Sequence, residues 1–463
     1  MPACTLGGFA RGLGNTYICG EEILFDMATR GKYCFTDAEI RKISLWIVAA
    51  SVALQVVLIS VFWGAPMESD AKFYVDYAMQ CHMAGEWYPM RCHLNDFFLV
   101  TPGLVNFYIL QLNILGTLNF NMLFNLLMAC GITYLIFKIA KHHFGAAVGY
   151  ITIALWSLLY SNWMIVLPAM TELPFLLLCL AAYYAALAKR RWVTFLLCGV
   201  LLAVANWIRP LVVIFLPTML AVMYFRRLRA ACYVALFAAM AAGILIIAQA
   251  TRAKIGVAAF QSSTMGINLI MSANDKAYGG VAAQLFYDPS SICYIENRDG
   301  YTFAQKDSIW TRRAVEWILD NPGKYAKLYP LKVGGVFFED SWPDRPVMFG
   351  KSSAGIASIG MSEGVFSGNF IKRFYKRIAK SAVYYIVMIL ALCGLVSSRR
   401  SIARNWRSEG SLLLILIIGV AVTCLFSVCP RYHYPFLFVL VAYAARFVYG
   451  RLRRGQGDGA PTC

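Results

Sequence analysis

The chain has 463 residues, of which 60% are hydrophobic and only 14% are charged. Soluble domains carry about a quarter of charged residues, so this composition excludes a soluble globular protein. The formal net charge of +18 invites a nucleic-acid partner, but many of the basic residues stand in short clusters between apolar segments, as topology signals of membrane proteins do. We therefore predict an all-α polytopic membrane protein without a nucleic-acid partner.

The first apolar segment follows a mixed N-terminal tail. Residues 1–42 combine acids, bases and glycines and lack the apolar core of a signal peptide, which predicts a cytoplasmic tail. Residues 43–63 then carry no charge over a length that crosses the ~30 Å hydrocarbon core of a bilayer. Similar segments continue to residue 248, so we expect an N-terminal transmembrane module over 43–248.

Clusters of Lys and Arg in short loops mark the cytoplasmic side of a membrane. Placing all of these clusters inside predicts about ten spans with both termini inside. The predicted spans cover residues 43–63, 119–137, 145–161, 171–188, 192–208, 211–225, 230–248, 381–397, 410–428 and 433–450. The last three form a C-terminal group of transmembrane helices over 381–450, followed by a cytoplasmic tail over 451–463.

Two longer segments are predicted to face outward. The first outer loop, residues 64–118, mixes polar and aromatic residues, and its stretch Leu104–Leu115 is apolar but short, which indicates an interfacial helix. Residues 249–380 are mostly polar and contain several Pro and Gly breaks, which predicts a small outer domain of α or α+β structure. Long loops of this kind cross the membrane largely regardless of their charge.

An acid and a tyrosine stand near the start of the first outer loop. Asp70 and Tyr74 are four residues apart, so on a helix they share one face. Asp70 is a candidate general base at the membrane surface. The alternative is an acid that stabilises the first turn of a helix through the helix dipole.

Three charged residues are expected at the outer ends of spans. Glu172 heads an apolar segment, Arg209 lies between two such segments, and Arg431 occupies a short outer turn, CPRYHYP. Arginines on the outer side run against the positive-inside rule, and a phosphate group at headgroup depth would explain them because its oxygens suit the guanidinium fork. The alternatives are a first-turn acid and arginines that extend to lipid headgroups.

The segment from Gly266 to Gly280, GINLIMSANDKAYGG, is small, polar and turn-forming, as loops that bind anions or sugars with backbone N–H groups are. No spacing of Cys and His residues suggests zinc, so we predict no metal site and no cofactor, without excluding a divalent metal. Cys81 and Cys92 both lie in the first outer loop, where an oxidising compartment would allow a disulfide.

Taken in order, these motifs resemble the glycosyltransferase superfamily C (GT-C), in particular bacterial relatives of the dolichyl-phosphate-mannose–protein mannosyltransferases and the lipid A aminoarabinose transferases. The resemblance covers most of the chain. The matching positions are Asp70 with Tyr74, Phe144-Gly145, Glu172, Arg209-Pro210, Gly266, Asn268, Leu269, Asn274 and Gly279, Asn321-Pro322-Gly323, Lys332, and Arg431-Tyr432 with Pro435. One departure is that many relatives have Asp-Glu in the first loop, where this chain has Asp70-Ala71.

The resemblance implies a membrane glycosyltransferase, hexosyl or pentosyl, that moves a sugar from a polyprenyl-phosphate-sugar donor to an acceptor hydroxyl or phosphate by direct inverting displacement. It implies an outer active site in the inner or plasma membrane and an envelope glycolipid, glycan or protein as acceptor. Asp70 would be catalytic. The implied substrate-binding residues are Tyr74, Glu172, Arg209, Asn268, Asn274, Lys332, Arg431 and Tyr432.

Two other functions fit parts of the sequence. A transporter or flippase of an amphiphilic lipid-linked substrate would place ionisable residues in the middle of its spans, whereas these spans are nearly free of them. A polymerase or ligase using a lipid-linked substrate would use the same arginines but would leave the loop around Asp70 unexplained. The identity of the sugar and of the acceptor is not encoded in any motif.

Overall fold

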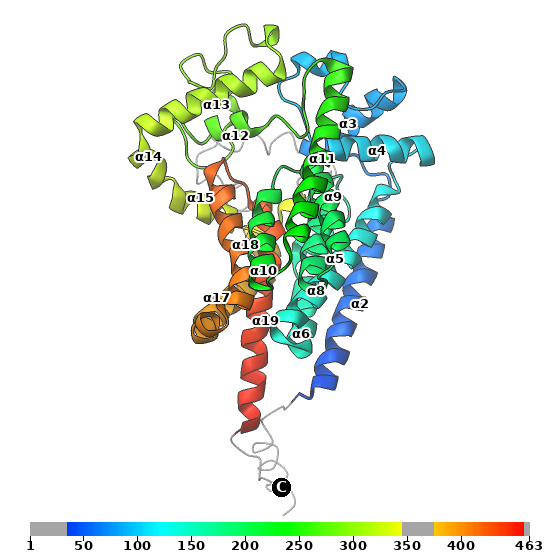
Figure 1. The fold of residues 1–463 in the computed structure, drawn as a ribbon, viewed down its shortest axis with the longest axis vertical. Coiled ribbons are helices and arrows are strands. Elements are labelled where there is room, and N and C mark those ends of the chain that lie inside the picture. Colours follow the sequence, from blue (N-terminus) through cyan, green and yellow to red (C-terminus); the bar gives the residue numbers. More distant parts are fainter. Residues whose placement is uncertain (1–34, 345–374, 458–463) are drawn as a thin grey trace, which may run out of the picture.

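The computed structural model describes residues 35–344 and 375–457, and this part of the chain is helical with one isolated β-bridge, between Gly280 and Val428. Figure 1 shows a bundle of long helices along the vertical axis, with α3, α4 and α12 to α14 gathered at its upper end. The prediction of an all-α architecture is thus confirmed for the described residues. Three parts of the chain lie outside the described residues: 1–34 and 458–463 in the two predicted tails, and 345–374 in the outer segment.

Within the described residues, six helices are long and apolar enough to cross a membrane. They are α2 (Asp37–Val61), α5 (Asn121–Phe144), α11 (Ala230–Ile255), α17 (Ala382–Arg404), α18 (Trp406–Leu425) and α19 (Tyr434–Gly457). The chain is therefore a multi-pass membrane protein. The other four predicted spans correspond to shorter apolar helices, α6 (Ala146–Ser157), α8 (Glu172–Ala188), α9 (Trp192–Ile208) and α10 (Leu216–Phe225), whose crossing of the membrane stays a prediction.

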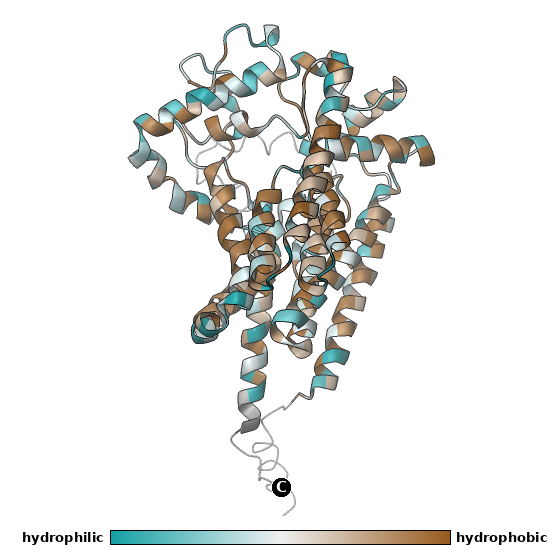
Figure 2. Ribbon diagram, viewed as in Figure 1, coloured by the Kyte–Doolittle hydropathy of each residue, from teal (hydrophilic) through white to brown (hydrophobic). Residues whose placement is uncertain are grey.

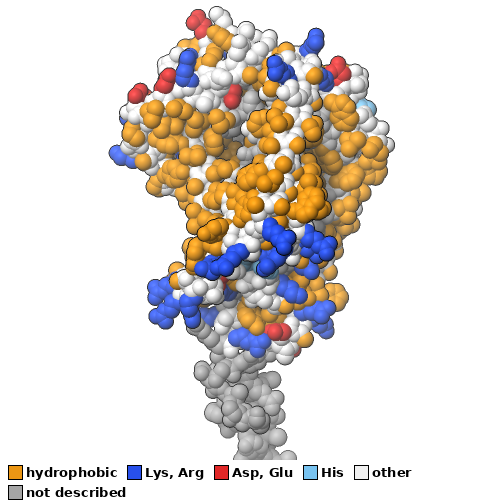
Figure 3. All heavy atoms as spheres, in the orientation of Figure 1, with side chains coloured by type: hydrophobic (Ala, Val, Ile, Leu, Met, Phe, Trp, Pro, Cys, Tyr) orange, Lys and Arg blue, Asp and Glu red, His pale blue; other side chains and the backbone are white. Residues whose placement is uncertain are grey.

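The surface of the bundle is apolar where a soluble protein would be polar. Leu127 on α5 and Ile246 on α11 are each 68% exposed. Figure 2 shows hydrophobic residues along the outer faces of these helices, and Figure 3 shows a broad hydrophobic belt with Lys and Arg gathered along its lower edge. A hydrophobic belt bounded by basic residues on one side is typical of multi-pass membrane proteins.

Small residues allow the helices to pack closely, as in other membrane bundles. A Cβ atom added to Gly199 on α9 would lie 2.3 Å from the carbonyl oxygen of Leu236 on α11. A Cβ atom on Gly394 of α17 would lie 2.1 Å from the carbonyl oxygen of Tyr443 on α19. Both pairs of helices therefore approach each other backbone to backbone.

The first outer loop contains α3 (Ser69–Met83), the 3-10 helix η1 (Arg91–Asn95) and α4 (Pro102–Leu115). The helix expected at Leu104–Leu115 is thus present, and α4 lies across the end of the bundle in Figure 1. A Cβ atom on Gly103 would lie 2.8 Å from the backbone nitrogen of Ile208, so α4 rests directly on the end of α9. Cys81 is buried on α3, Cys92 is exposed in η1, and both are free thiols.

The second outer segment has its own small core beside the first loop. Its buried residues include Ile270, Cys293 and Trp310, and Phe97 of the first loop packs against them. The elements of this segment are α12 (Met265–Ile270), η3 (Ala283–Phe286), η4 (Arg298–Gly300), α13 (Phe303–Asp320), α14 (Pro322–Lys327), α15 (Tyr329–Val336) and η5 (Trp342–Asp344). Its described part is helical, and α11 continues to Ile255 before it begins.

The remaining short elements connect helices at the outer end of the bundle. They are α7 (Tyr160–Met164), η2 (Val212–Ile214) and η7 (Pro430–His433). The span predicted at 145–161 is shorter in the structure, because α6 ends at Ser157 and α7 follows.

Candidate functional site

A cluster of charged residues forms where α3, α8, α9 and η7 meet. Asp70 lies in the first turn of α3, where the helix dipole favours an acid. Its Oδ2 atom lies 2.5 Å from Nη2 of Arg431, which η7 presents just before α19 begins. The Asp70 side chain is 37% exposed and that of Arg431 is 23% exposed, so the pair borders the outside of the protein. It joins residues that are 361 positions apart in the sequence.

Glu172 holds two arginines in place. It is the first residue of α8 and is fully buried. Its Oε1 atom lies 2.5 Å from Nη1 of Arg209 and 3.9 Å from Nε of Arg431. Nη1 of Arg209 also donates a hydrogen bond to Oγ1 of Thr171 over 3.1 Å. Because a buried carboxylate without a partner is very costly, these contacts explain how an acid is tolerated at this depth.

Two tyrosines complete the cluster. The ring centroid of Tyr432 lies 5.5 Å from the guanidinium carbon of Arg209 and 5.7 Å from that of Arg431, within the range of cation–π contacts. Tyr74 is buried one turn along α3 from Asp70. Burial, together with the nearby Asp70 carboxylate, raises the pKa of Tyr74 above its ordinary value, so its hydroxyl stays protonated.

Six of the nine residues expected from the sequence thus come together: Asp70, Tyr74, Glu172, Arg209, Arg431 and Tyr432. Two carboxylates and two guanidinium groups balance each other in charge. Such a cluster can bind an anion through the arginines and offers a carboxylate beside it. Their individual roles in substrate binding or catalysis stay predictions.

Asn268 lies in α12 and Asn274 in the turn that follows it, in a segment held by backbone and side-chain hydrogen bonds. The backbone N–H of Ser427 donates to the carbonyl oxygen of Asn268 over 3.0 Å, and that of Val428 donates to Gly279 over 2.9 Å. The segment from Gly266 to Gly280 therefore holds residues 427–428, which come just before Arg431. The Nδ2 atom of Asn274 donates to the carbonyl oxygen of Ile270 over 2.8 Å.

Lys332 is a buried cation that contacts no acidic side chain in the part of the chain that the structure describes. It lies on α15 with 0% of its surface exposed, and its Nζ atom has no hydrogen-bond partner among the described residues. The Nζ atom lies 4.3 Å from the ring centroid of Tyr325. Burial lowers the pKa of Lys332 from 10.5 to about 8. One turn further along α15, the carbonyl oxygen of Val336 accepts a hydrogen bond from His433 of η7 over 2.8 Å, which places Lys332 close to the cluster but outside it.

The lowered pKa leads to a stability prediction for Lys332→Met. Below pH 8 both the folded and the unfolded protein carry the charge, so the folded state bears the full cost of burying it; between pH 8 and 10.5 this cost disappears. Lys332→Met is therefore expected to raise the Tm of the purified protein by a few degrees at pH 7 and by less at pH 9.5. Lys327→Met, at an exposed position just before α15, is the control. An equal or lower Tm for Lys332→Met at pH 7 would show that the charge is compensated.

A second buried pair beside the cluster was not expected from the sequence. His433 and Asp340 are both fully buried, with Nε2 of His433 3.8 Å from Oδ1 of Asp340. The other oxygen of Asp340 accepts a hydrogen bond from the backbone N–H of Ser161 over 2.9 Å, and the Asp340 N–H donates to Ser381 over 2.9 Å. This network ties α7, α17 and η7 together. The signal in the sequence was the adjacent acids Glu339 and Asp340 in a chain with few acids.

Metal ligands do not gather in the described part of the chain, where no group of three or more His, Cys, Asp or Glu side chains has a suitable arrangement. The cluster itself has two carboxylates, each paired with an arginine.

Comparison with protein-family models finds no matching family, and comparison with curated proteins finds no match. Among solved structures, the chain is similar to the oligosaccharyltransferase of Archaeoglobus fulgidus in the apo form, with a TM-score of 0.48 and 14% identity over 91% of this chain and 53% of that chain. A structure of the same enzyme, AglB, with an inhibitory peptide and a dolichol-phosphate matches with a TM-score of 0.43 and 14% identity, covering 91% and 52% of the two chains. ArnT from Cupriavidus metallidurans bound to undecaprenyl phosphate matches with a TM-score of 0.37 and 14% identity, covering 88% and 77%.

The matched structures are those of GT-C proteins, the superfamily that the sequence motifs resemble. The chain spans about half the length of the oligosaccharyltransferase structures that it matches. With TM-scores below 0.5 and 14% identity, these similarities do not establish the activity of this chain.

Proposed function

We propose that this protein is a membrane glycosyltransferase, which moves a sugar from a polyprenyl-phosphate-sugar donor to a hydroxyl-bearing acceptor at the outer face. The observation that carries the proposal is the contact between Asp70 and Arg431, beside a second arginine. Helix α3, which carries Asp70, lies at the upper end of the bundle (Figure 1), opposite the lower edge where Lys and Arg gather (Figure 3). A lipid phosphate at headgroup depth fits the arginines, and a carboxylate beside it fits a general base.

The donor phosphate would replace Asp70 as the partner of Arg431. The guanidinium of Arg431 already contacts a carboxylate oxygen at 2.5 Å, and a phosphate oxygen offers the same kind of acceptor. Asp70 is thereby released beside the bound donor. In this arrangement the base becomes available only after the donor has bound, which keeps acceptor activation tied to the presence of donor.

The chemical step is a single displacement. The acceptor oxygen forms a bond to the anomeric carbon while the bond between that carbon and the phosphate oxygen breaks, and the bonding electrons remain on the phosphate. Asp70 takes the proton of the acceptor hydroxyl. Arg431 and Arg209 stabilise the charge that develops on the phosphate, in the manner of an oxyanion clamp. Direct displacement inverts the configuration at the anomeric carbon.

The buried members of the cluster act through the arginines. Glu172 is fully buried and contacts both guanidinium groups, so its proposed role is to position them. Tyr432 packs under both guanidinium groups, and the protonated hydroxyl of Tyr74 is available as a donor to substrate oxygens. Lys332, Asn268 and Asn274 are proposed to help bind the substrate or hold the loop that meets it.

The position of the charges supports a transferase over a transporter. Glu172 is the first residue of α8, Arg209 follows the last residue of α9, and Arg431 precedes α19. All three lie at helix ends on one side, where the chemistry would face the periplasm or another extracytoplasmic space. A transporter site is expected near the middle of the membrane.

Binding of a carrier phosphate tests this proposal with farnesyl phosphate as a short probe. The purified protein in nanodiscs is expected to gain thermal stability with farnesyl phosphate and not with farnesol, which lacks only the phosphate. In Arg431→Gln the gain should disappear. An equal response to both probes, or an unchanged response in the variant, would remove the lipid-phosphate site from the cluster.

A further inference from the structure

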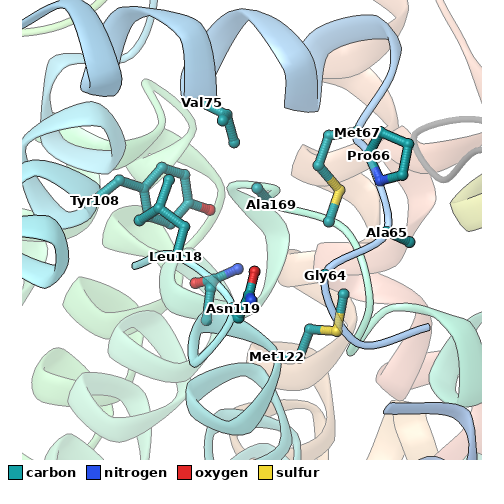
Figure 4. A pocket seen from close by; sticks show the side chains of 11 residues that line it. Gly64, Ala65, Pro66, Met67, Val75, Tyr108, Leu118, Asn119, Met122 and Ala169 are labelled. Atoms are coloured by element: carbon teal, nitrogen blue, oxygen red, sulfur yellow. The ribbon is translucent and has the colours of Figure 1, made fainter. Parts of the chain in front are cut away.

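A pocket of about 140 Å³ lies beneath α3, next to the charged cluster. Figure 4 shows Val75 of α3 above it, Tyr108 of α4 on one side, and Met67 of the α2–α3 connection on the other. The residues that line the pocket include Met67, Tyr108, Asn119, Asn121, Met122 and Ala169. The proposed function does not use this space.

The pocket is mostly apolar, with the amides of Asn119 and Asn121 and the hydroxyl of Tyr108 as its polar side-chain groups, and none of its lining residues is ionised at neutral pH. Asn121 is 4% exposed, and its side chain adjoins the hydroxyl of Tyr108, while its Nδ2 atom makes no hydrogen bond of good geometry within the described residues. Gln111, beside it, donates to Asn121 Oδ1 over 3.4 Å, while its own Oε1 atom also lacks a described partner. A buried amide without a partner costs free energy, so these groups call for a ligand with hydroxyl groups or for water.

The remaining walls are apolar or aromatic. Figure 4 shows the sulfur-bearing side chains of Met67 and Met122 and the ring of Tyr108 facing the space around the Asn119 amide. A ring that has both apolar faces and hydroxyl edges matches such a mixture. A phosphate does not, because an anion in an uncharged, partly apolar pocket pays its desolvation without a cation to compensate.

The size of the pocket limits its occupant. A volume of about 140 Å³ is several times the ~30 Å³ share of one water molecule in the liquid. It is smaller than the ~300–1,000 Å³ clefts that take drug-sized ligands. One small ring fits this range, whereas an oligosaccharide or a lipid chain does not.

The pocket borders both the cluster and the lipid-facing surface. Val75 follows Tyr74 on α3, and Ala169 lies three residues before Glu172. On the other side, Trp63 and Phe120 form an edge-on aromatic pair with ring centroids 5.6 Å apart, next to the lining residues Gly64 and Asn119. Exposed aromatic rings of this kind mark the membrane interface. A ring attached to a membrane lipid would thus lie beside this aromatic pair, next to Val75 of α3 and Ala169.

We propose that this pocket binds one uncharged sugar ring, with Asn121 and Asn119 hydrogen-bonded to its hydroxyl groups and Met67, Met122 and Tyr108 against its faces. The inference rests on the proposed function, which supplies a sugar on the donor and, for a glycolipid acceptor, another on the acceptor. Both sources offer the same chemistry to the pocket.

Methionine-methyl NMR tests the proposal on the full chain in nanodiscs. The methyl signals of Met67 and Met122 are assigned from Met67→Leu and Met122→Leu. The probes are methyl glycosides of glucose, galactose, arabinose and N-acetylglucosamine, with inorganic phosphate as the anionic comparison. At least one glycoside is expected to shift both signals saturably, and phosphate is expected to shift neither.

The variant Asn121→Leu should weaken this binding by about tenfold, as expected for the loss of a hydrogen bond to a buried partner. Asn113→Leu, which changes an exposed amide on α4, should bind as the parent does. The proposal is overturned if no glycoside shifts the two signals, if phosphate shifts them, or if Asn121→Leu binds equally well.

Two further comparisons tell a donor sugar from an acceptor sugar, and a failure of this proposal from a failure of the proposed function. The mass of the carrier-linked sugar in a deletion strain names the donor ring; binding of that glycoside assigns the pocket to the donor, and binding of other glycosides alone assigns it to the acceptor. Absence of glycoside binding with an intact farnesyl phosphate response rejects only this pocket. Glycoside binding without a farnesyl phosphate response rejects the proposed function instead.

Discussion

Asp70→Asn is expected to slow sugar transfer by about 10²–10⁴-fold, the usual contribution of a positioned general base. The amide keeps the shape of the carboxylate but cannot accept the acceptor proton. Because Arg431 also contacts Glu172, the change should leave the arginine in place and the fold intact. The measurement is the rate at which membranes from a deletion strain, carrying each variant, consume the carrier-linked sugar.

Asp76→Asn is the matched control for this experiment. Asp76 lies on the same helix but is exposed, and its partner is Lys72, 2.7 Å away on the surface. An exposed pair of this kind contributes little to stability, so activity and Tm should both stay close to those of the parent. If Asp70→Asn consumes the donor as fast as Asp76→Asn does, Asp70 is a helix-capping acid and the base must be sought elsewhere.

Arg431→Lys is expected to lower kcat by about 10²–10³-fold, comparable to the loss of one donor from an oxyanion hole. Lysine keeps the positive charge but loses the planar fork that contacts Asp70 and Glu172 and that would bind the phosphate in place of Asp70. It also gives up the guanidinium contact with the ring of Tyr432. The same donor-consumption assay applies, with protein amounts matched by quantitation of the purified variants.

Arg453→Lys serves as the control because it makes the same chemical change in an exposed pair with Asp37 at the far end of α19. It should retain parental activity. A parental rate for Arg431→Lys would mean that a point charge suffices at this position, as an arginine extending to lipid headgroups would allow.

The sequence could predict a membrane protein because a helix that faces lipid must carry apolar side chains along its length. The charge-free segment 43–63 and the exposed Leu127 and Ile246 reflect the same requirement. Helix ends were less predictable. The span expected at 145–161 stops at Ser157, where the Asn162 side chain donates to the carbonyl oxygen of Trp156 over 2.5 Å and Asp340 accepts from the Ser161 N–H. The contact with Asp340 comes from a distant part of the chain, and neither contact leaves a periodic pattern in the sequence.

Part of the site was predictable because charges in apolar surroundings are costly and so stand out. Glu172, Arg209 and Arg431 each interrupt or border an apolar segment, and the structure brings all three into contact. The sequence did not indicate which of these residues contact each other. The bond from Val428 to Gly279, which fixes the chain just before Arg431, uses only backbone groups, and any residue can supply these.

The pocket beneath α3 could not be predicted from the sequence. Asn119, Asn121, Met67 and Met122 are ordinary residues in sequence, and only the fold places their side chains around one space. Asn121 also carries no signal of its own, because a polar residue at the start of a helix is common. That its Nδ2 atom makes no hydrogen bond of good geometry within the described residues becomes visible only once its neighbours are known.

Mass spectrometry of membrane lipids tests the central claim most directly. Lipids are extracted from three strains: the parent, a deletion of this protein, and the deletion carrying Asp70→Asn. We expect a polyprenyl phosphate bearing one sugar to accumulate in both defective strains and not in the parent, and the mass of that species identifies the sugar class. Equal levels of this lipid in all three strains would contradict the claim that the protein consumes it.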